Sequence, residues 1–350
     1  MTRTLVVALA TEGLQGTAES LAALAGADTD VAVVGVEGGP VSPFDDRVVP
    51  EGLRCWESPV KLGSVRALGT AFHLAVHQRY DTLVVVVGAV QVPADLAARC
   101  AAVLHGTESI AGLAAWSSTT PLHPLPVPDA VRMTDRLVFC EVSTAIADHF
   151  GTAAIDLPVL ESPLVALSVD AIRQVGPVDP VFQTVPGAIA DWSLRARAHG
   201  LRVALAPSVV VAQGSCGVTD EQEVAVLDLR YPLRAQQRDA FEHSRLLRRA
   251  EPFIPDAVVR QRVAARGWSL GSDDASGRRE DGAVFVRADP DRPGQVHVHA
   301  LGFVQDLLLA GDDPVAELTA RWGVPPVSVE SSTRKPSRPT AAVDYPERVW

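Results

Sequence analysis

The sequence contains little lysine and no excess of positive charge. Of its 31 basic residues only Lys61 and Lys335 are lysines, whereas 42 residues are acidic, which gives a formal net charge of −11. Binding nucleic acid by neutralising phosphates calls for the opposite balance, so the composition argues against that class. The chain is rich in Ala, Val, Gly and Pro, so we attribute arginine clusters such as Arg245, Arg248 and Arg249 to a GC-rich genome and not to anion binding.

Long apolar runs and patterned cysteines are absent as well. Hydrophobic residues make up 47% of the chain, yet no run approaches the roughly 20 residues of a membrane span. The brief apolar part of residues 1–16 predicts a buried strand and not a signal peptide. The four cysteines, Cys55, Cys100, Cys140 and Cys216, lack the spacing of a metal site or a disulfide framework. We therefore expect core thiols and a cytoplasmic protein.

The first third of the chain alternates valine-rich runs with segments of helical periodicity. Strands are predicted at Thr4–Ala10, Asp30–Val36, Thr82–Val87 and Ser109–Ser117, and helices at Gly16–Ala25, Ser64–Gln78 and Ala94–His105. Continuous apolar strands separated by helices indicate a parallel sheet that is covered on both faces. The predicted fold class is therefore α/β, with a mainly parallel central sheet.

The rest of the chain continues this pattern and then changes character near Arg230. After the proline-rich stretch Pro121–Pro128, strands are predicted at Ser162–Val169, Leu201–Ala206 and Ser208–Ala212, and helices at Val169–Val175 and Ile189–His199. Beyond Arg230 the predicted elements are helices at Ala235–Ala250, Pro255–Arg266, Val304–Ala310 and Ala316–Trp322, with a hairpin formed by Ala283–Ala288 and Gln295–Leu301. The predicted domains are 1–230, a small α+β appendage of helices and a hairpin at 231–330, and a disordered tail at 331–350.

Two stretches of the chain carry motifs that belong together. Residues 162–219 contain a turn of the type VG-x-D-x-x-F, in which the fixed positions are Val175, Gly176, Asp179 and Phe182. A helix that includes Asp191 and Trp192 follows the turn. The stretch ends in the pattern R-V-x-x-x-P-x-x-V, in which the fixed positions are Arg202, Val203, Pro207 and Val210. Residues 61–96 contain a helix, a strand and a proline turn in matching order. The chain thereby resembles the inverting family-2 glycosyltransferases over roughly residues 3–220. The resemblance implies a Rossmann-like nucleotide-sugar transferase domain of the GT-A type.

The positions at which this family places its chemistry are occupied by other residue types. Ala89 and Gln91 stand in place of the metal-binding D-x-D, and Ala188 and Ile189 stand in place of the E-D pair that carries the general base. Gln213 stands where a metal-associated histidine is usual. Because alanine cannot ligate a metal, no dependence on Mg²⁺ or Mn²⁺ is expected.

The resemblance leaves three hypotheses open. In the first, the protein has lost metal-dependent sugar transfer and is a binding, scaffolding or regulatory subunit in a glycan or glycolipid pathway, with a protein partner on the C-terminal region. In the second, it is an active metal-independent glycosyltransferase with a nucleotide-sugar donor. Asp191 is then the candidate catalytic residue, and Glu37, Lys61 and Gln91 are the candidate donor-binding residues. In the third, an inactive fold binds a nucleotide and reports its level.

Several candidates have plainer explanations. His73 and His77 lie four residues apart on a predicted helix and could share a metal, but no third ligand is in view. His297 and His299 share one face of the hairpin, where a surface or interface role is favoured over a metal site. Asp191 either acts as an acid or holds its helix, and the second role is favoured.

Overall fold

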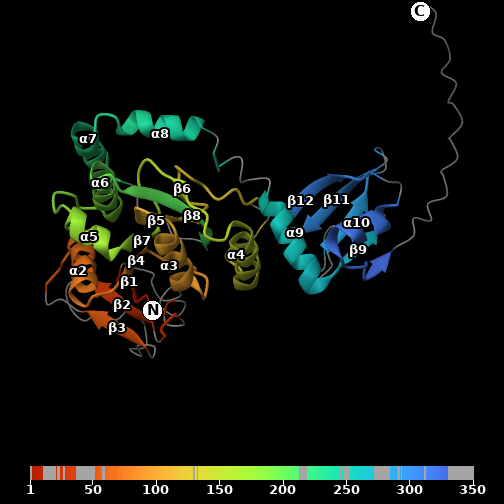
Figure 1. Cartoon of the computed structure of the whole chain (residues 1–350), viewed down its shortest axis with the longest axis horizontal. Helices are drawn as coiled ribbons and strands as arrows, with labels where there is room; N and C mark the ends of the chain where they lie inside the picture. The colour runs from red at the N-terminus through yellow and green to blue at the C-terminus, as the bar shows by residue number, and fades with distance from the viewer. Residues whose placement is uncertain are drawn as a thin grey trace, which may run out of the picture. The chain divides into compact units, whose positions relative to one another are not determined.

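The structure is a computed structural model (Figure 1). It describes residues 2–10, 21, 24–26, 28–36, 52–56, 60–128, 131, 133–212, 219–244, 246–247, 253–271, 284–289, 292, 294–310 and 313–329. Glu37, Gln213, Cys216, the tail 331–350 and most of the predicted helix Gly16–Ala25 lie outside these ranges. The chain divides into two compact units, residues 1–258 with 301–303 and residues 259–300 with 304–350. The domain limits drawn from the sequence stay a prediction.

The first unit is built on a mixed sheet that confirms the predicted fold class. Its described part has eight strands in the order β3-β2-β1-β4-β7-β5-β8-β6. The strands are β1 (Thr4–Ala10), β2 (Thr29–Gly35), β3 (Leu53–Trp56), β4 (Thr82–Val87), β5 (Ile110–Ser117), β6 (Ile155–Asp156), β7 (Leu164–Ser168) and β8 (Arg202–Val211). Strands β3, β2, β1 and β4 run parallel, as do β5 and β8, whereas β7 is antiparallel to β4 and β5, and β6 to β8.

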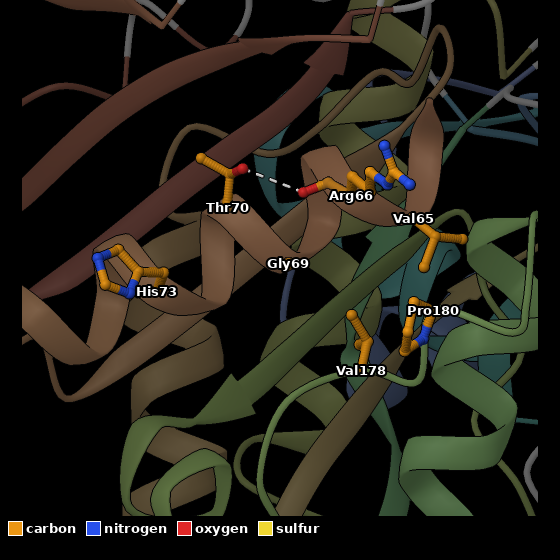
Figure 2. A pocket seen from close by; sticks show the side chains of 7 residues that line it. All are labelled: Val65, Arg66, Gly69, Thr70, His73, Val178 and Pro180. Atoms are coloured by element: carbon orange, nitrogen blue, oxygen red, sulfur yellow. Dashed lines mark hydrogen bonds between the residues drawn. The ribbon is translucent and has the colours of Figure 1, made fainter. Parts of the chain in front are cut away.

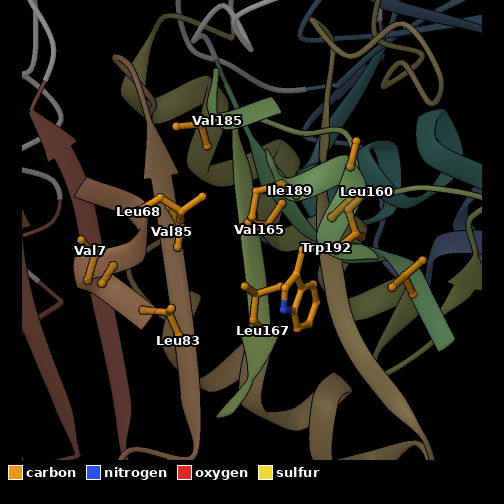
Figure 3. Close-up of a cluster of buried hydrophobic side chains, with 14 of the residues drawn as sticks. Val7, Leu68, Leu83, Val85, Leu160, Val165, Leu167, Val185, Ile189 and Trp192 are labelled. Carbon is orange, nitrogen blue, oxygen red and sulfur yellow. The ribbon is translucent and has the colours of Figure 1, made fainter. Parts of the chain in front are cut away.

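Helices cover both faces of this sheet. The helices of the first unit are α2 (Ser64–His77), α3 (Leu96–Gly106), α4 (Arg136–Phe150), α5 (Val169–Val175), α6 (Val185–Ala198), α7 (Glu221–Arg230) and α8 (Arg234–His243). Buried side chains of α2, α5 and α6 form one core with Val7, Val85 and Val165 (Figure 3). Buried side chains of α3 form the other core with Val6, Val84 and the opposite face of the sheet. The strands are therefore buried on both faces, which explains their unbroken valine runs.

Two details of the first unit differ from the sequence prediction. Helix α6 begins at Val185 and not at Ile189, because the Thr184 side chain accepts a hydrogen bond from the Gly187 amide and proline occupies its first turn. The two strands predicted around Pro207 are the single strand β8. The register shifts between Ala206 and Val210, and this bulge accommodates the proline.

The second unit contains a smaller sheet. In the described residues its five strands lie in the order β12-β11-β10-β9-β13, namely β9 (Trp268–Gly271), β10 (Val284–Ala288), β11 (Gln295–Ala300), β12 (Phe303–Leu308) and β13 (Ser328–Val329). Helix α10 (Pro314–Trp322) packs on it, and the unit boundary falls within α9 (Phe253–Arg266). Strands β10 and β11 form the predicted antiparallel hairpin.

The predicted helix at Val304–Ala310 is wrong, because this segment is strand β12. Phe303 and Leu307 are buried while Val304, Asp306 and Leu308 are exposed, which is the two-residue alternation of a strand with one covered face. Strand β12 forms backbone hydrogen bonds with the neighbouring strand β11, and this pairing overrides the helix propensity of the leucine run.

The helices were compared with the length and hydropathy of a membrane span. None of those in the described residues combines the length with the hydropathy that a bilayer span demands.

Candidate functional site

The carboxyl ends of the parallel strands form one edge of the large sheet, and Lys61, Ala89 and Gln91 of the predicted positions lie there. The Val87 amide at the end of β4 donates to the Pro163 carbonyl just before β7, at 2.8 Å. The Ser162 hydroxyl donates to the Ala115 carbonyl of β5 at 3.0 Å. Since ligands of open α/β sheets bind outside the carboxyl ends of the strands, this edge is the candidate site.

The segment in place of the D-x-D motif lies on this edge. Gln91 and Ala212 exchange two backbone hydrogen bonds, of 2.8 and 3.1 Å, so the ends of β4 and β8 are joined directly. Ala89 is exposed and offers no ligand atom, and Gln91 offers one amide oxygen. These side chains do not fit a divalent cation that requires carboxylate oxygens.

Lys61 reaches the same edge from the start of α2. The amides of Leu62 and Gly63 each donate to the Val36 carbonyl at 3.1 Å, which fixes this junction at the end of β2. Lys61 is exposed, and α2 has neither a side-chain cap at Gly63 nor an acidic residue in its first turn. An uncapped helix N-terminus beside a lysine provides positive potential for an anionic group.

Ala188 and Ile189, which the sequence resemblance aligns with the general base, face inward by contrast. Ala188 and Ile189 lie in the first turns of α6 and are buried in the core against the sheet. Figure 3 shows Ile189 beside Val165 of β7. Both side chains are therefore enclosed in the core.

Asp191 is fully buried and fully engaged. Its Oδ2 atom accepts from Arg195 Nε at 2.9 Å, and its Oδ1 atom accepts from Tyr231 Oη at 2.9 Å and Arg230 Nη1 at 3.2 Å. Burial, followed by the charge of Asp191, raises the pKa of Tyr231 to about 12, so the phenol stays a donor. Arg230 also pairs with Asp179 at 2.7 Å. The network ties α6 to α7 and to the turn after α5, and it favours the holding role for Asp191.

Glu223 on α7 is a buried acid that the sequence did not single out. Its Oε1 atom accepts from the backbone amides of Gln183 and Thr184 at 2.5 and 2.9 Å, and its Oε2 atom accepts from the Thr184 hydroxyl. A Cβ at Gly187 would come within 2.5 Å of that oxygen, so a larger residue there would displace the carboxylate from its present position. The carboxylate thus accepts from the residues that open α6, close to Ala188 and Ile189, and no local sequence motif predicts this contact.

Replacing Glu223 with alanine is expected to lower the free energy of unfolding by about 2 kcal/mol, because the donors that precede α6 lose their buried acceptor. Urea denaturation measures the change. Glu221→Ala, on the exposed side of the same turn, serves as the control and should stay within about 0.5 kcal/mol. Equal effects of the two substitutions would contradict the capping role.

A second group of polar residues near the loop after β5 was also missed from the sequence, and in it His123 is buried and Glu161 and Arg238 are half-buried. Glu161 accepts a hydrogen bond from Arg238 Nη1 of α8. Burial raises the pKa of the Glu161 carboxyl, although the Arg238 charge opposes the increase. Burial lowers the pKa of His123 to about 4, so this imidazole is neutral at physiological pH. The sequence predicted only an extended loop around His123.

A shallow hollow of about 370 Å³ lies against α2 (Figure 2). Val65, Arg66 and His73 line it from the helix, and Val178 and Pro180 line it from the turn after α5. It is open, lies along α2 and contains none of the residues predicted for the site, so we assign no chemistry to it.

The histidine pairs are placed as follows. The rings of His73 and His77 stack with centroids 5.5 Å apart on the exposed face of α2. In the second unit His297 lies between Asp306, 2.7 Å from Nδ1, and Asp289, 3.4 Å from Nε2. Burial lowers the pKa of His299. Nowhere in the described ranges do three His, Cys, Asp or Glu side chains converge as metal ligands.

Comparison with known proteins yields likeness in structure but none in sequence. No protein-family model matches the chain, and no curated protein matches it significantly. GalNAc-T7, solved with UDP, GalNAc and Mn²⁺, is 10% identical over 61% of this chain and 44% of its own, with a TM-score of 0.44. TarS of S. aureus, residues 1–349, is 10% identical over 75% and 72% of the two chains at a TM-score of 0.44, and its UDP-GlcNAc complex is 12% identical over 75% and 73% at 0.44.

The chain therefore spans less than half the length of the GalNAc-T7 chain that it matches. Likenesses of this degree assign no activity, so a function has to rest on this chain's own residues.

Proposed function

We propose that this chain is a glycosyltransferase-like protein that has lost metal-dependent sugar transfer and acts as a binding, scaffolding or regulatory subunit in a glycan or glycolipid pathway. The observation that carries the proposal is that the three residues of α6 considered for catalysis are all buried in the fold. Ala188 and Ile189 are buried in the core, and Asp191 is held by Arg195, Arg230 and Tyr231.

The magnitudes support a loss of catalysis. Removing a general base costs about 10²–10⁴-fold in rate. For Asp191 to accept a proton from a bound hydroxyl, it would have to leave two ion pairs in a buried site, and the arginines would lose a partner in exchange. The segment at Ala89 and Gln91 supplies no carboxylate to neutralise a diphosphate through a metal ion.

The ligand we propose for the sheet edge is a nucleotide or a nucleotide sugar. Lys61 and the start of α2, which has no side-chain cap among the described residues, place a cation beside the positive end of a helix, a combination suited to a diphosphate. The same observation favours the second candidate function, an active metal-independent glycosyltransferase, in which Lys61 would take over the role of the metal.

Calorimetric titration of the full chain with UDP, GDP and their sugar conjugates, with and without Mn²⁺, tests these proposals. We expect at least one nucleotide to bind with a Kd that is micromolar or weaker and that Mn²⁺ does not change. Lys61→Ala should raise this Kd about tenfold. The sugar conjugates should release no nucleoside diphosphate. Arg79→Ala, an exposed cation at the far end of α2, is the matched control. Binding enhanced by Mn²⁺ would contradict the proposal, and metal-independent turnover that requires Lys61 would establish the second candidate.

A further inference from the structure

Helix α2 lies in a part of the chain that carries no acidic residue. The chain as a whole has 42 acids and 31 bases, yet residues 58–80 contain neither Asp nor Glu. The exposed side of the helix bears Arg66, His73 and His77. One helix face of an otherwise acidic protein is therefore free of negative charge along its whole length.

The side chains that α2 turns outward follow one another at helical spacing. They are Arg66, Thr70, His73 and His77, which we call the α2 stripe. At 1.5 Å per residue the stripe is about 16 Å long. The guanidinium of Arg66 forms no ion pair with any residue in the described ranges. It is therefore available to a carboxylate from another molecule.

The hollow of about 370 Å³ adjoins the α2 stripe and has a largely apolar lining (Figure 2). Val65 and Gly69 contribute to its wall on α2, and Val178 and Pro180 form the opposite wall. Its volume lies at the low end of the roughly 300–1,000 Å³ of ligand pockets. The hollow offers no catalytic group, but it can receive an apolar side chain beside the cationic stripe.

The acid nearest to this wall in the sequence does not reverse the charge of the site. Asp179 lies between Val178 and Pro180, and its carboxylate pairs with Arg230 at 2.7 Å. Hydrogen bonds from the Val181 amide and from Arg230 lower the pKa of Asp179 and outweigh its partial burial, so it stays ionised and paired. The unpaired charge at the hollow is that of Arg66.

We propose that the α2 stripe and the hollow form a docking site for an acidic peptide segment of a partner protein. One apolar side chain of the segment sits in the hollow, and its carboxylates lie on Arg66 and the imidazoles of His73 and His77. The inference rests on the proposed function, because it names the class of partner that a binding or scaffolding subunit would hold. The docking site uses neither Lys61 nor Gln91.

The shape of the site favours a peptide over other acidic ligands. About five residues of extended chain match the 16 Å of the stripe, and alternate side chains of such a segment point to one side. A membrane surface calls for apolar side chains that protrude, whereas the apolar residues here line a hollow. Charge complementarity and an apolar anchor together define the segment as acidic residues around one aliphatic or aromatic residue.

The test is selection of peptides from a displayed library of random decapeptides on the full chain. We expect enrichment of sequences in which Asp and Glu flank an apolar residue. A selected peptide, labelled with a fluorophore, should bind with a Kd of tens of micromolar or tighter by fluorescence polarisation, and added salt should weaken it. Arg66→Glu should raise the Kd at least tenfold. Arg136→Glu, an exposed charge reversal in the first turn of α4, is the matched control and should leave it unchanged.

Gly69 allows the hollow to be tested separately from the charge. A Cβ built there has Val178 Cγ2 as its nearest neighbour, at an ordinary contact distance of 3.7 Å. Gly69→Leu should therefore fill the hollow and raise the Kd about tenfold, whereas Gly69→Ala should stay within about threefold of the parent. Both replacements favour the helix, so lost binding does not reflect unfolding, and circular dichroism verifies this.

The proposal is overturned if no peptide is enriched, if the enriched peptides are not acidic, or if binding survives Arg66→Glu or Gly69→Leu. Binding to phosphatidylserine vesicles in place of peptides would also overturn it. Lys61→Ala should leave peptide binding unchanged, so the two sites are scored independently. Failure of the peptide selection leaves the nucleotide titration as it stands, and failure of the nucleotide titration leaves a measured peptide affinity intact.

Discussion

Replacing Asp191 with alanine is expected to lower the free energy of unfolding by about 4 kcal/mol, one of the two largest effects predicted for this chain. The side chain is 0% exposed and accepts three hydrogen bonds, from Arg195, Arg230 and Tyr231. Removing one member of a buried ionic network typically costs about 3–5 kcal/mol, because the remaining groups lose their partner without regaining water. Urea denaturation of the full chain, followed by tryptophan fluorescence, measures the change.

Asp170→Ala is the matched control for this substitution. Asp170 pairs with Arg173 at 2.5 Å, but its side chain is 88% exposed, and an exposed pair contributes about 0–1 kcal/mol. Asp191→Asn keeps the volume and one acceptor, so it should fall between the two. A stable Asp191→Asn protein that had lost a measurable sugar-transfer activity would show instead that the acid is functional.

The strands of the first unit could be predicted because a strand that is buried on both faces is an unbroken run of apolar residues. Residues Thr82–Val87 were predicted as a strand with the bounds that the structure gives to β4. The start of α6 was missed although the signal was present, since Thr184 followed by proline in the first turn is a typical helix opening. At β12 the error had another source, because strand pairing with β11 is a tertiary contact that periodicity does not contain.

Some features of the candidate site could likewise be predicted from the sequence, and others depend on tertiary contacts. The residue types at Ala89, Ala188 and Ile189 can be read directly from the chain once their motif is recognised. The Glu161–Arg238 pair joins residues 77 positions apart, so no local pattern predicts it. The same holds for Glu223, which caps a helix that begins 38 residues earlier in the sequence. Burial of polar groups is decided by packing, and packing is what the sequence pattern leaves open.

The second large effect concerns pH and His123. Its pKa of about 4 in the folded chain lies below its ordinary value of 6.5, because burial disfavours the imidazolium. The unfolded chain therefore binds a proton first as the pH falls, and the contribution of the neutral ring to stability, complete above pH 6.5, is lost progressively toward pH 4. A shift of this size corresponds to about 3 kcal/mol.

His123→Leu and His123→Gln both remove this titration, so the difference in unfolding free energy between each variant and the parent should change by about 3 kcal/mol between pH 7 and pH 4. At pH 7 the leucine variant should stay within about 1 kcal/mol of the parent, because it exchanges a neutral buried ring for an apolar side chain of similar size. His73→Gln, on the exposed face of α2, is the control and should leave the pH dependence as it is.

A leucine variant that is as stable as the parent at pH 7 would mean that folding does not require the imidazole at position 123. Conversely, a loss of several kcal/mol at pH 7 in both variants would show that His123 is held by contacts which stabilise the fold.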